Sequence, residues 1–239
     1  MLRCLCLIAL LVPAGCSPPP QAPTEFDDLC AFIFAHRDDS DLETLQLAVD
    51  NLQAWLKSNR ESVEEGYVVQ NIDPKVVEEM EGKPFDLTHL LGVAHATEYD
   101  ASLEQMFDII LDPNEEASID EEGRTTKKRT YLTDRDCFVA GTCNRLEYTN
   151  EAINDYPLTL EATVHYKSIL RRIQTTEGPT IVAWNFFIEP SRFNFDWLSV
   201  DLTYYLGVSV EKEDKRVERT QATWILANMG DGPVPVDVG

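Results

Sequence analysis

The sequence is poor in basic residues. Lysine and arginine together number 20 against 42 aspartates and glutamates in 239 residues, which gives a formal net charge of −22. A protein that binds nucleic acid needs cationic side chains to replace the counterions of the phosphates. The composition therefore excludes a nucleic-acid partner and is typical of a strongly acidic protein.

Long hydrophobic runs and catalytic motifs are also lacking. The apolar stretch at residues 4–12 is too short to cross a bilayer as a helix. The sequence contains no G-x-S-x-G, Walker loop, G-x-G-x-x-G or H-E-x-x-H motif. No two histidines are spaced to share one face of a helix; they are His36, His89, His95 and His165. We therefore predict no catalytic residue, no cofactor and no metal site.

The first residues have the pattern of an export signal. Arg3 is followed by the apolar stretch and then by Ala14, Gly15 and Cys16. These small residues before a cysteine resemble the lipobox of bacterial lipoproteins, although Pro13 stands where that family prefers leucine. The resemblance implies a cleaved signal over residues 1–15 and a Cys16 that carries fatty-acyl chains such as palmitate. It further implies attachment to a membrane of the cell envelope, most simply the outer membrane. The alternative is a secreted protein with an ordinary signal peptide.

The residues after Cys16 predict a tether. Residues 16–24 include four prolines, a composition that favours an extended polyproline II chain. Because the sequence offers no second hydrophobic anchor, membrane attachment would depend on Cys16 alone.

Three cysteines remain in the mature chain. Cys137 and Cys143 close a short loop with a glycine at its bend, which in an exported protein favours a local disulfide. A redox pair is the weaker reading, because catalytic dithiols usually have two residues between them. Cys30 lies in an apolar segment and is expected to be a buried thiol, although spacing also allows it to pair with either of the other two.

Charge and periodicity divide the mature chain into two halves. Residues 25–123 hold 26 acidic and 5 basic side chains, whereas residues 124–239 hold 16 and 14. Helical spacing and capping signals predict helices in the acidic half, at residues 29–36 (capped by Asp27 or Asp28), 40–59, 74–82 and 103–110 (capped by Ser102). Residues 112–123 are predicted to form an acidic surface loop. They do not fit a twelve-residue calcium-binding loop, because Ala117 stands where that loop needs a glycine for its turn and Gly123 stands where it needs a glutamate that binds calcium with both oxygens.

The balanced half predicts strands. Alternating or continuous apolar residues mark four of them, at residues 158–167, 180–188, 200–210 and 216–226. Short links between them favour an antiparallel meander. We therefore predict an α+β fold, in which an N-terminal acidic helical layer packs on a C-terminal antiparallel sheet of about four or more strands. The domain would cover residues 25–230, followed by a flexible tail at 231–239.

Aromatic residues crowd the strand half and give the candidate ligand site. A curved sheet lined by aromatic rings and covered by helices can enclose an apolar ligand, as lipid-carrying helix-grip domains do by analogy of fold. The residues of this candidate site are Trp184, Phe186, Trp197, Tyr204 and Trp224. Ordinary core packing is the simpler interpretation of the same residues.

Three function classes follow. The first is a non-enzymatic structural or interaction protein of the envelope, which would turn its acidic surface toward a cationic partner. The second is a carrier or binder of a lipid or another apolar ligand. The third is a hydrolase that uses carboxylate chemistry.

Overall fold

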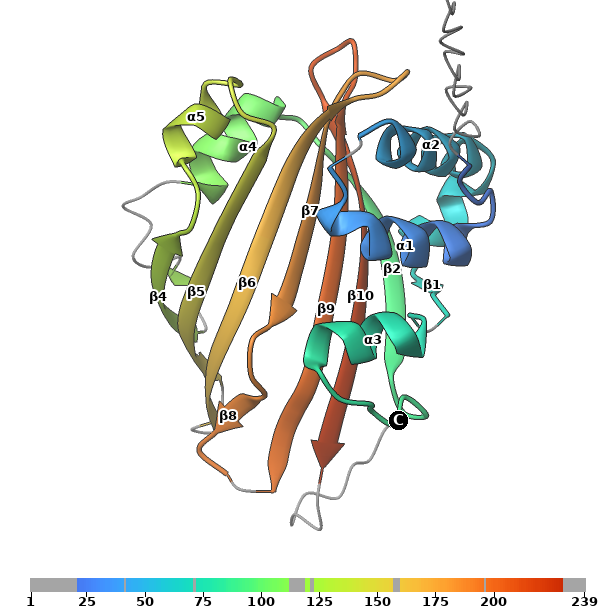
Figure 1. Ribbon diagram of the computed structural model, residues 1–239. Coiled ribbons are helices and arrows are strands. Elements are labelled where there is room, and N and C mark those ends of the chain that lie inside the picture. The colour runs from blue at the N-terminus through green and yellow to red at the C-terminus, as the bar shows by residue number, and fades with distance from the viewer. Residues whose placement is uncertain are drawn as a thin grey trace, which may run out of the picture.

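The computed structural model describes residues 21–40, 42–70, 72–111, 119–120, 123–156, 160–195 and 197–229. The signal segment, Cys16, residues 112–118 and the C-terminal tail lie outside these ranges. The described chain forms an α+β fold in which N-terminal helices pack on a large antiparallel sheet (Figure 1). The predicted fold class is confirmed.

Three helices form the N-terminal layer: α1 (Phe26–Ala35), α2 (Leu42–Glu64) and α3 (Pro74–Glu81), with the short 3-10 helix η1 (His36–Asp38) after α1. The predicted limits of α3 are confirmed: Asp73 caps its first turn by accepting a hydrogen bond from the Lys75 backbone N–H, and Gly82 ends it at φ 68°. Helix α2 continues past the predicted end near residue 59. Val63 lies two helical turns after Leu56 and is buried on the same face of the helix.

The predicted cap of α1 is wrong. The helix begins at Phe26, before both aspartates, and Glu25 at its N-cap makes no side-chain cap. Asp27 instead ties α1 to the chain after α2, because its carboxylate accepts hydrogen bonds from the Gln70 backbone N–H (2.8 Å) and the Tyr67 hydroxyl (3.3 Å).

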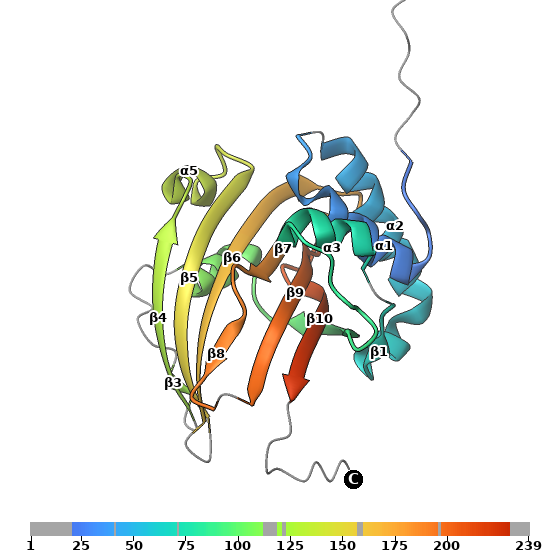
Figure 2. The same cartoon turned by 60° about the horizontal axis from the view of Figure 1, so that its bottom comes forward.

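The sheet follows the order β1-β2-β10-β9-β7-β6-β5-β4-β3, with β8 pairing β6 and β9 beside this path. Its strands are β1 (Tyr67–Val68), β2 (Leu91–Tyr99), β3 (Ile119–Asp120), β4 (Gly123–Tyr131), β5 (Arg145–Tyr156), β6 (Leu160–Gln174), β7 (Pro179–Phe187), β8 (Ser191–Phe193), β9 (Leu198–Glu211) and β10 (Val217–Met229). The predicted meander is β6-β7-β9-β10, and all its pairings are antiparallel. The sheet is strongly curved (Figure 2).

The sequence prediction missed several strands. The edge strand β1 and its neighbour β2 come from the acidic half, and β2 pairs with β10 over nine residues. Strands β3, β4 and β5 extend the sheet on the opposite side of β6. The prediction of a loop over residues 112–123 is therefore wrong at its end, where β3 pairs with β4.

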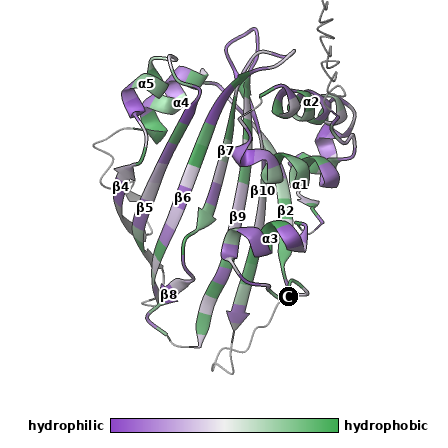
Figure 3. Ribbon diagram, viewed as in Figure 1, coloured by the Kyte–Doolittle hydropathy of each residue, from purple (hydrophilic) through white to green (hydrophobic). Residues whose placement is uncertain are grey.

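Each face of the sheet carries its own apolar cluster. Hydrophobic and hydrophilic residues form alternating bands along the strands (Figure 3). We call the side covered by α1, α2 and α3 the helical face; its core includes Trp184, Tyr204 and Trp224. We call the other side the α4 face, because α4 (Leu103–Ile110) covers one end of it together with α5 (Arg135–Val139). The predicted cap of α4 is confirmed, as Ser102 and Gln105 form a reciprocal capping box.

Candidate functional site

Three of the predicted aromatic residues form the centre of the helical face. Trp184, Tyr204 and Trp224 are each no more than 1% exposed. The rings of Tyr204 and Trp224 contact Phe34 of α1 edge-on, at centroid distances of 5.3 and 5.9 Å. Their close packing attaches the helical layer to the sheet.

The polar atoms of these three residues also serve the helical layer. The indole N–H of Trp184 donates to the Ile33 carbonyl (3.1 Å) and that of Trp224 to the Gln70 carbonyl (2.9 Å). The Tyr204 hydroxyl donates to the Glu81 carboxylate (2.7 Å), and burial together with this carboxylate raises its pKa. All three groups therefore have partners inside the domain.

The other two predicted residues lie apart from this centre. Phe186 packs, half-buried, against the edge of the same core. Trp197 is half-buried and makes a tilted contact with Phe195 at 5.8 Å. None of the five lines the cavity described next.

That cavity lies between α4 and the α4 face and has a volume of about 70 Å³. Its roof is apolar and comes from α4: Leu103, Met106, Phe107 and Ile110. Its floor includes four polar side chains from four strands: Tyr148, Asn185, Ser209 and Arg219. Tyr148 on β5 and Arg219 on β10 reach it across the three strands between them. Sequence reasoning missed this group.

Gly207 creates the space in which Arg219 is held. A Cβ atom at Gly207 would lie 2.6 Å from the Tyr205 hydroxyl, so the Tyr205 ring occupies the place of the missing side chain. The Tyr205 hydroxyl accepts hydrogen bonds from Nε (3.1 Å) and Nη2 of Arg219, which lies directly across the strand pair from Ser209. A glycine inside a strand often marks such a close approach, and this signal was present in the sequence.

A second arginine borders the same floor. The Arg129 guanidinium lies 4.6 Å from the centre of the Tyr148 ring, a cation–π distance. Its Nε donates to Asn150 Oδ1 (3.1 Å) and its Nη1 to the Ile110 carbonyl of α4 (2.6 Å). Arg129 therefore connects the floor of the cavity to its roof.

The two tyrosines of this region stay protonated at neutral pH. Burial raises the pKa of Tyr148, and the smaller opposing effects of Arg129 and Arg219 do not reverse the shift. Burial likewise raises the pKa of Tyr205, against the effect of Arg219. The Tyr148 hydroxyl can therefore serve as a hydrogen-bond donor.

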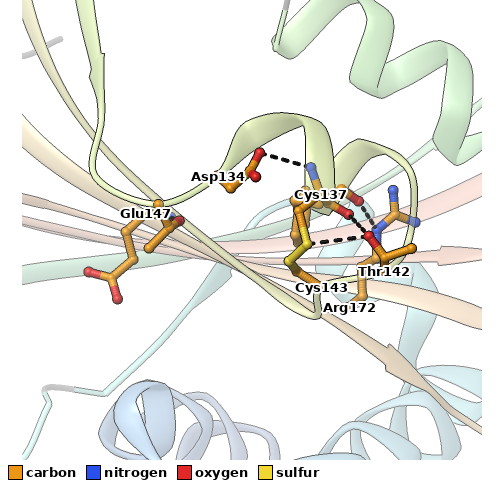
Figure 4. Close-up of a disulfide and its surroundings, with 8 residues drawn as sticks. Asp134, Cys137, Thr142, Cys143, Glu147 and Arg172 are labelled. Atoms are coloured by element: carbon orange, nitrogen blue, oxygen red, sulfur yellow. Dashed lines mark hydrogen bonds between the residues drawn. A yellow bond between two sulfur atoms is a disulfide. The ribbon is translucent and has the colours of Figure 1, made fainter.

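Cys137 and Cys143 form a disulfide with a Cα–Cα distance of 5.3 Å. Figure 4 shows it beside Asp134, which accepts a hydrogen bond from the Cys137 N–H and so caps α5. Nε of Arg172 on β6 donates to the Phe138 carbonyl (2.9 Å), and its guanidinium lies over the Phe107 and Phe138 rings. The loop is thus attached to the sheet and to α4. Cys30 is a free thiol, 1% exposed, and burial raises its pKa, which makes it a poor nucleophile.

Within the described residues, no three His, Cys, Asp or Glu side chains lie close enough together to hold a metal ion. None of the helices in the described part of the chain is long and apolar enough to cross a membrane. Comparison of the sequence with protein-family models and with curated proteins gave no match.

Proposed function

We propose that this chain is a lipoprotein of the bacterial cell envelope, acylated at Cys16, whose domain binds a cationic partner and does not catalyse a reaction. The anchor rests on the sequence of the signal segment. The binding role rests on one observation of the fold: the helical layer carries exposed carboxylates that have no cation beside them.

The clearest of these carboxylates lie on α2, directly after it, and on α3. Glu61, Glu65, Glu78 and Glu79 are exposed, and none of them forms an ion pair with a described residue. Other carboxylates are paired: Glu98 on β2 and Glu189 in the link between β7 and β8 each lie in an ion pair with an arginine. Unpaired charges of one sign attract a partner of the opposite sign over about 8 Å at physiological salt. The helical layer is therefore the surface that we assign to the partner.

The attachment point of the tether supports this arrangement. Asn51 on α2 donates from Nδ2 to the Pro23 carbonyl (2.7 Å), so the chain enters the domain along the helical layer. We expect the proline-rich residues 17–23 to be extended and to span about 20 Å. The acidic layer would then stand close to the anchoring membrane, within reach of basic segments of neighbouring envelope proteins.

The anchor is tested by Cys16→Ser. We expect this variant to lose its acyl label and to move from the membrane fraction to the soluble fraction, since no second anchor was found in the sequence. Metabolic labelling with a fatty acid and fractionation measure both effects. Cys30→Ser is the matched control and should keep label and location. Unchanged labelling of Cys16→Ser would contradict the anchor.

The binding surface is tested by Glu78→Gln/Glu79→Gln. We expect the parent chain to cross-link to an envelope partner in cells and this double variant to lose most of that cross-linking. We also expect the parent interaction to weaken as salt rises. The matched control is Glu161→Gln/Glu213→Gln, which removes the same charge from exposed positions on the sheet half. Equal loss in both variants would show that net charge alone matters and would refute the assigned surface.

The alternative of an apolar carrier finds little support in the cavity under α4. Pockets that enclose drug-sized ligands measure roughly 300–1,000 Å³. A volume of about 70 Å³ is too small for an acyl chain. Trp184, Tyr204 and Trp224, the central residues of the predicted carrier site, belong to the packed core. We therefore keep the interaction role as the proposed function.

A further inference from the structure

The cavity under α4 differs in charge from the protein as a whole. The chain carries a net charge of −22, yet none of the eleven residues that line this cavity is acidic. Its polar floor instead supplies the Arg219 guanidinium, the Asn185 amide and the Ser209 and Tyr148 hydroxyls. Each of these groups can donate a hydrogen bond.

The arginines of this region have no carboxylate to neutralise them. Within the described residues, neither Arg219 nor Arg129 forms an ion pair; their hydrogen bonds go to hydroxyl, amide and carbonyl oxygens. Both side chains are half-buried. Withdrawing a cation from water without a counter-ion is unfavourable, so this environment favours the entry of an anion.

Asn150 lies near the cavity without lining it, and it also lacks an acceptor. It is 2% exposed, and its Nδ2 has no hydrogen-bond partner in the described part of the chain. Asn150 follows Tyr148 by two residues on the same face of β5, about 7 Å along the strand. Buried donors are nearly always satisfied in native structures, and an unmatched one points to a missing water, ion or ligand.

The volume limits what the cavity can hold. Since one water takes about 30 Å³ in the liquid, about 70 Å³ is room for roughly two waters. That space holds one small oxyanion, and it excludes a lipid tail. The planar guanidinium of arginine matches the two oxygens of a carboxylate.

We propose that the cavity under α4 binds one small oxyanion, and that the best-fitting class is the carboxylate of a small organic acid. Arg219 would hold the anion, with Asn185, Ser209 and Tyr148 as further donors and the α4 side chains against its carbon atoms. This inference goes beyond the proposed partner surface, which lies on the other face of the sheet, and it does not depend on the anchor at Cys16.

The test is calorimetric titration of the purified full-length protein with sodium acetate, sodium phosphate and sodium chloride at equal ionic strength. We expect saturable binding of acetate, weaker binding of phosphate and none of chloride. Arg219→Gln should weaken acetate binding about tenfold or more, because a charge-assisted hydrogen bond is lost. Asn185→Asp keeps the shape of the site but adds a negative charge, and it should abolish binding.

The matched control is Arg192→Gln on β8, where the guanidinium is exposed and pairs with Glu189. This variant should bind acetate like the parent. Saturable binding of phosphate but not of acetate would overturn the carboxylate assignment. The absence of any saturable binding, or binding that is equal in the parent and Asn185→Asp, would overturn the site. Should Arg219→Gln fail to fold, the nearly isosteric Asn185→Asp still decides.

Discussion

Replacing Trp184 by alanine should lower the free energy of unfolding by about 3–5 kcal/mol, the usual cost of truncating a fully buried tryptophan. Trp184 is 0% exposed and belongs to the core between the sheet and α1, where its indole N–H donates to the Ile33 carbonyl. The substitution therefore opens a cavity and also removes a hydrogen bond that attaches α1 to β7. Equilibrium unfolding in urea, followed by far-ultraviolet circular dichroism, measures the loss.

Trp197→Ala is the control for this prediction, because the same side chain is deleted at a half-buried position. Its contact with Phe195 is a single tilted one, so we expect a cost below about 1 kcal/mol. A similar loss for the two variants would contradict the assignment of Trp184 to the core. The pair also separates two interpretations of the aromatic residues, since a ligand-binding role alone would leave the stability of the free protein largely unchanged.

The elements that the sequence predicted well carry their signals locally. Asp73, Pro74 and Gly82 mark both ends of α3, and Ser102 with Gln105 marks the start of α4. Such signals act within a few residues and need no tertiary contact. The alternation along β9 was equally readable, because its larger apolar residues face the helical core.

Strand β2 was missed because its pattern is reversed. Its buried positions are Gly92, Ala94 and Ala96, whereas Leu91 and Val93 are exposed. Small residues are needed on the buried side: a Cβ atom at Gly92 would lie 2.7 Å from Cδ1 of Trp224. The size of the residues at these positions depends on a tryptophan more than 130 residues away, which no local window of sequence contains.

The cavity was missed for a related reason. Its polar floor comes from β5, β7, β9 and β10, and in sequence these side chains are isolated polar residues within strands. Every second residue in the described part of β5 is buried, but one of these buried residues is the polar Asn150. The alternation of apolar and polar residues that marks a strand is therefore broken in β5. These hydrogen-bond donors come together beneath α4 only through the pairing of the strands in the sheet. Gly207 is the one local sign of a close approach.

Glu211 holds the start of α4, which forms the roof of this cavity. Glu211→Ala should lower the free energy of unfolding by about 2 kcal/mol. The side chain accepts a hydrogen bond from the Leu103 N–H (3.0 Å) at the start of α4 and another from Lys215 Nζ (2.8 Å). Glu211 is only 9% exposed, so its removal leaves the first turn of α4 without a buried acceptor. Glu213→Gln, in the exposed turn after β9, is the control and should change stability by less than about 0.5 kcal/mol.

The pH dependence distinguishes a charge effect at Glu211 from a packing effect. Lys215, and to a smaller degree the Leu103 N–H, lower the pKa of Glu211 below its ordinary value despite partial burial. A carboxylate with a depressed pKa stabilises the folded state above its unfolded pKa, and this contribution is lost as the pH falls through the folded value. The difference in stability between the parent and the uncharged Glu211→Gln should therefore be full near about pH 7, well above the ordinary glutamate pKa, and should decrease as the pH falls below that pKa and through the lowered folded value. Urea titrations across this range measure it, and a difference that stays constant with pH would show that the charge of Glu211 does not hold α4 in place.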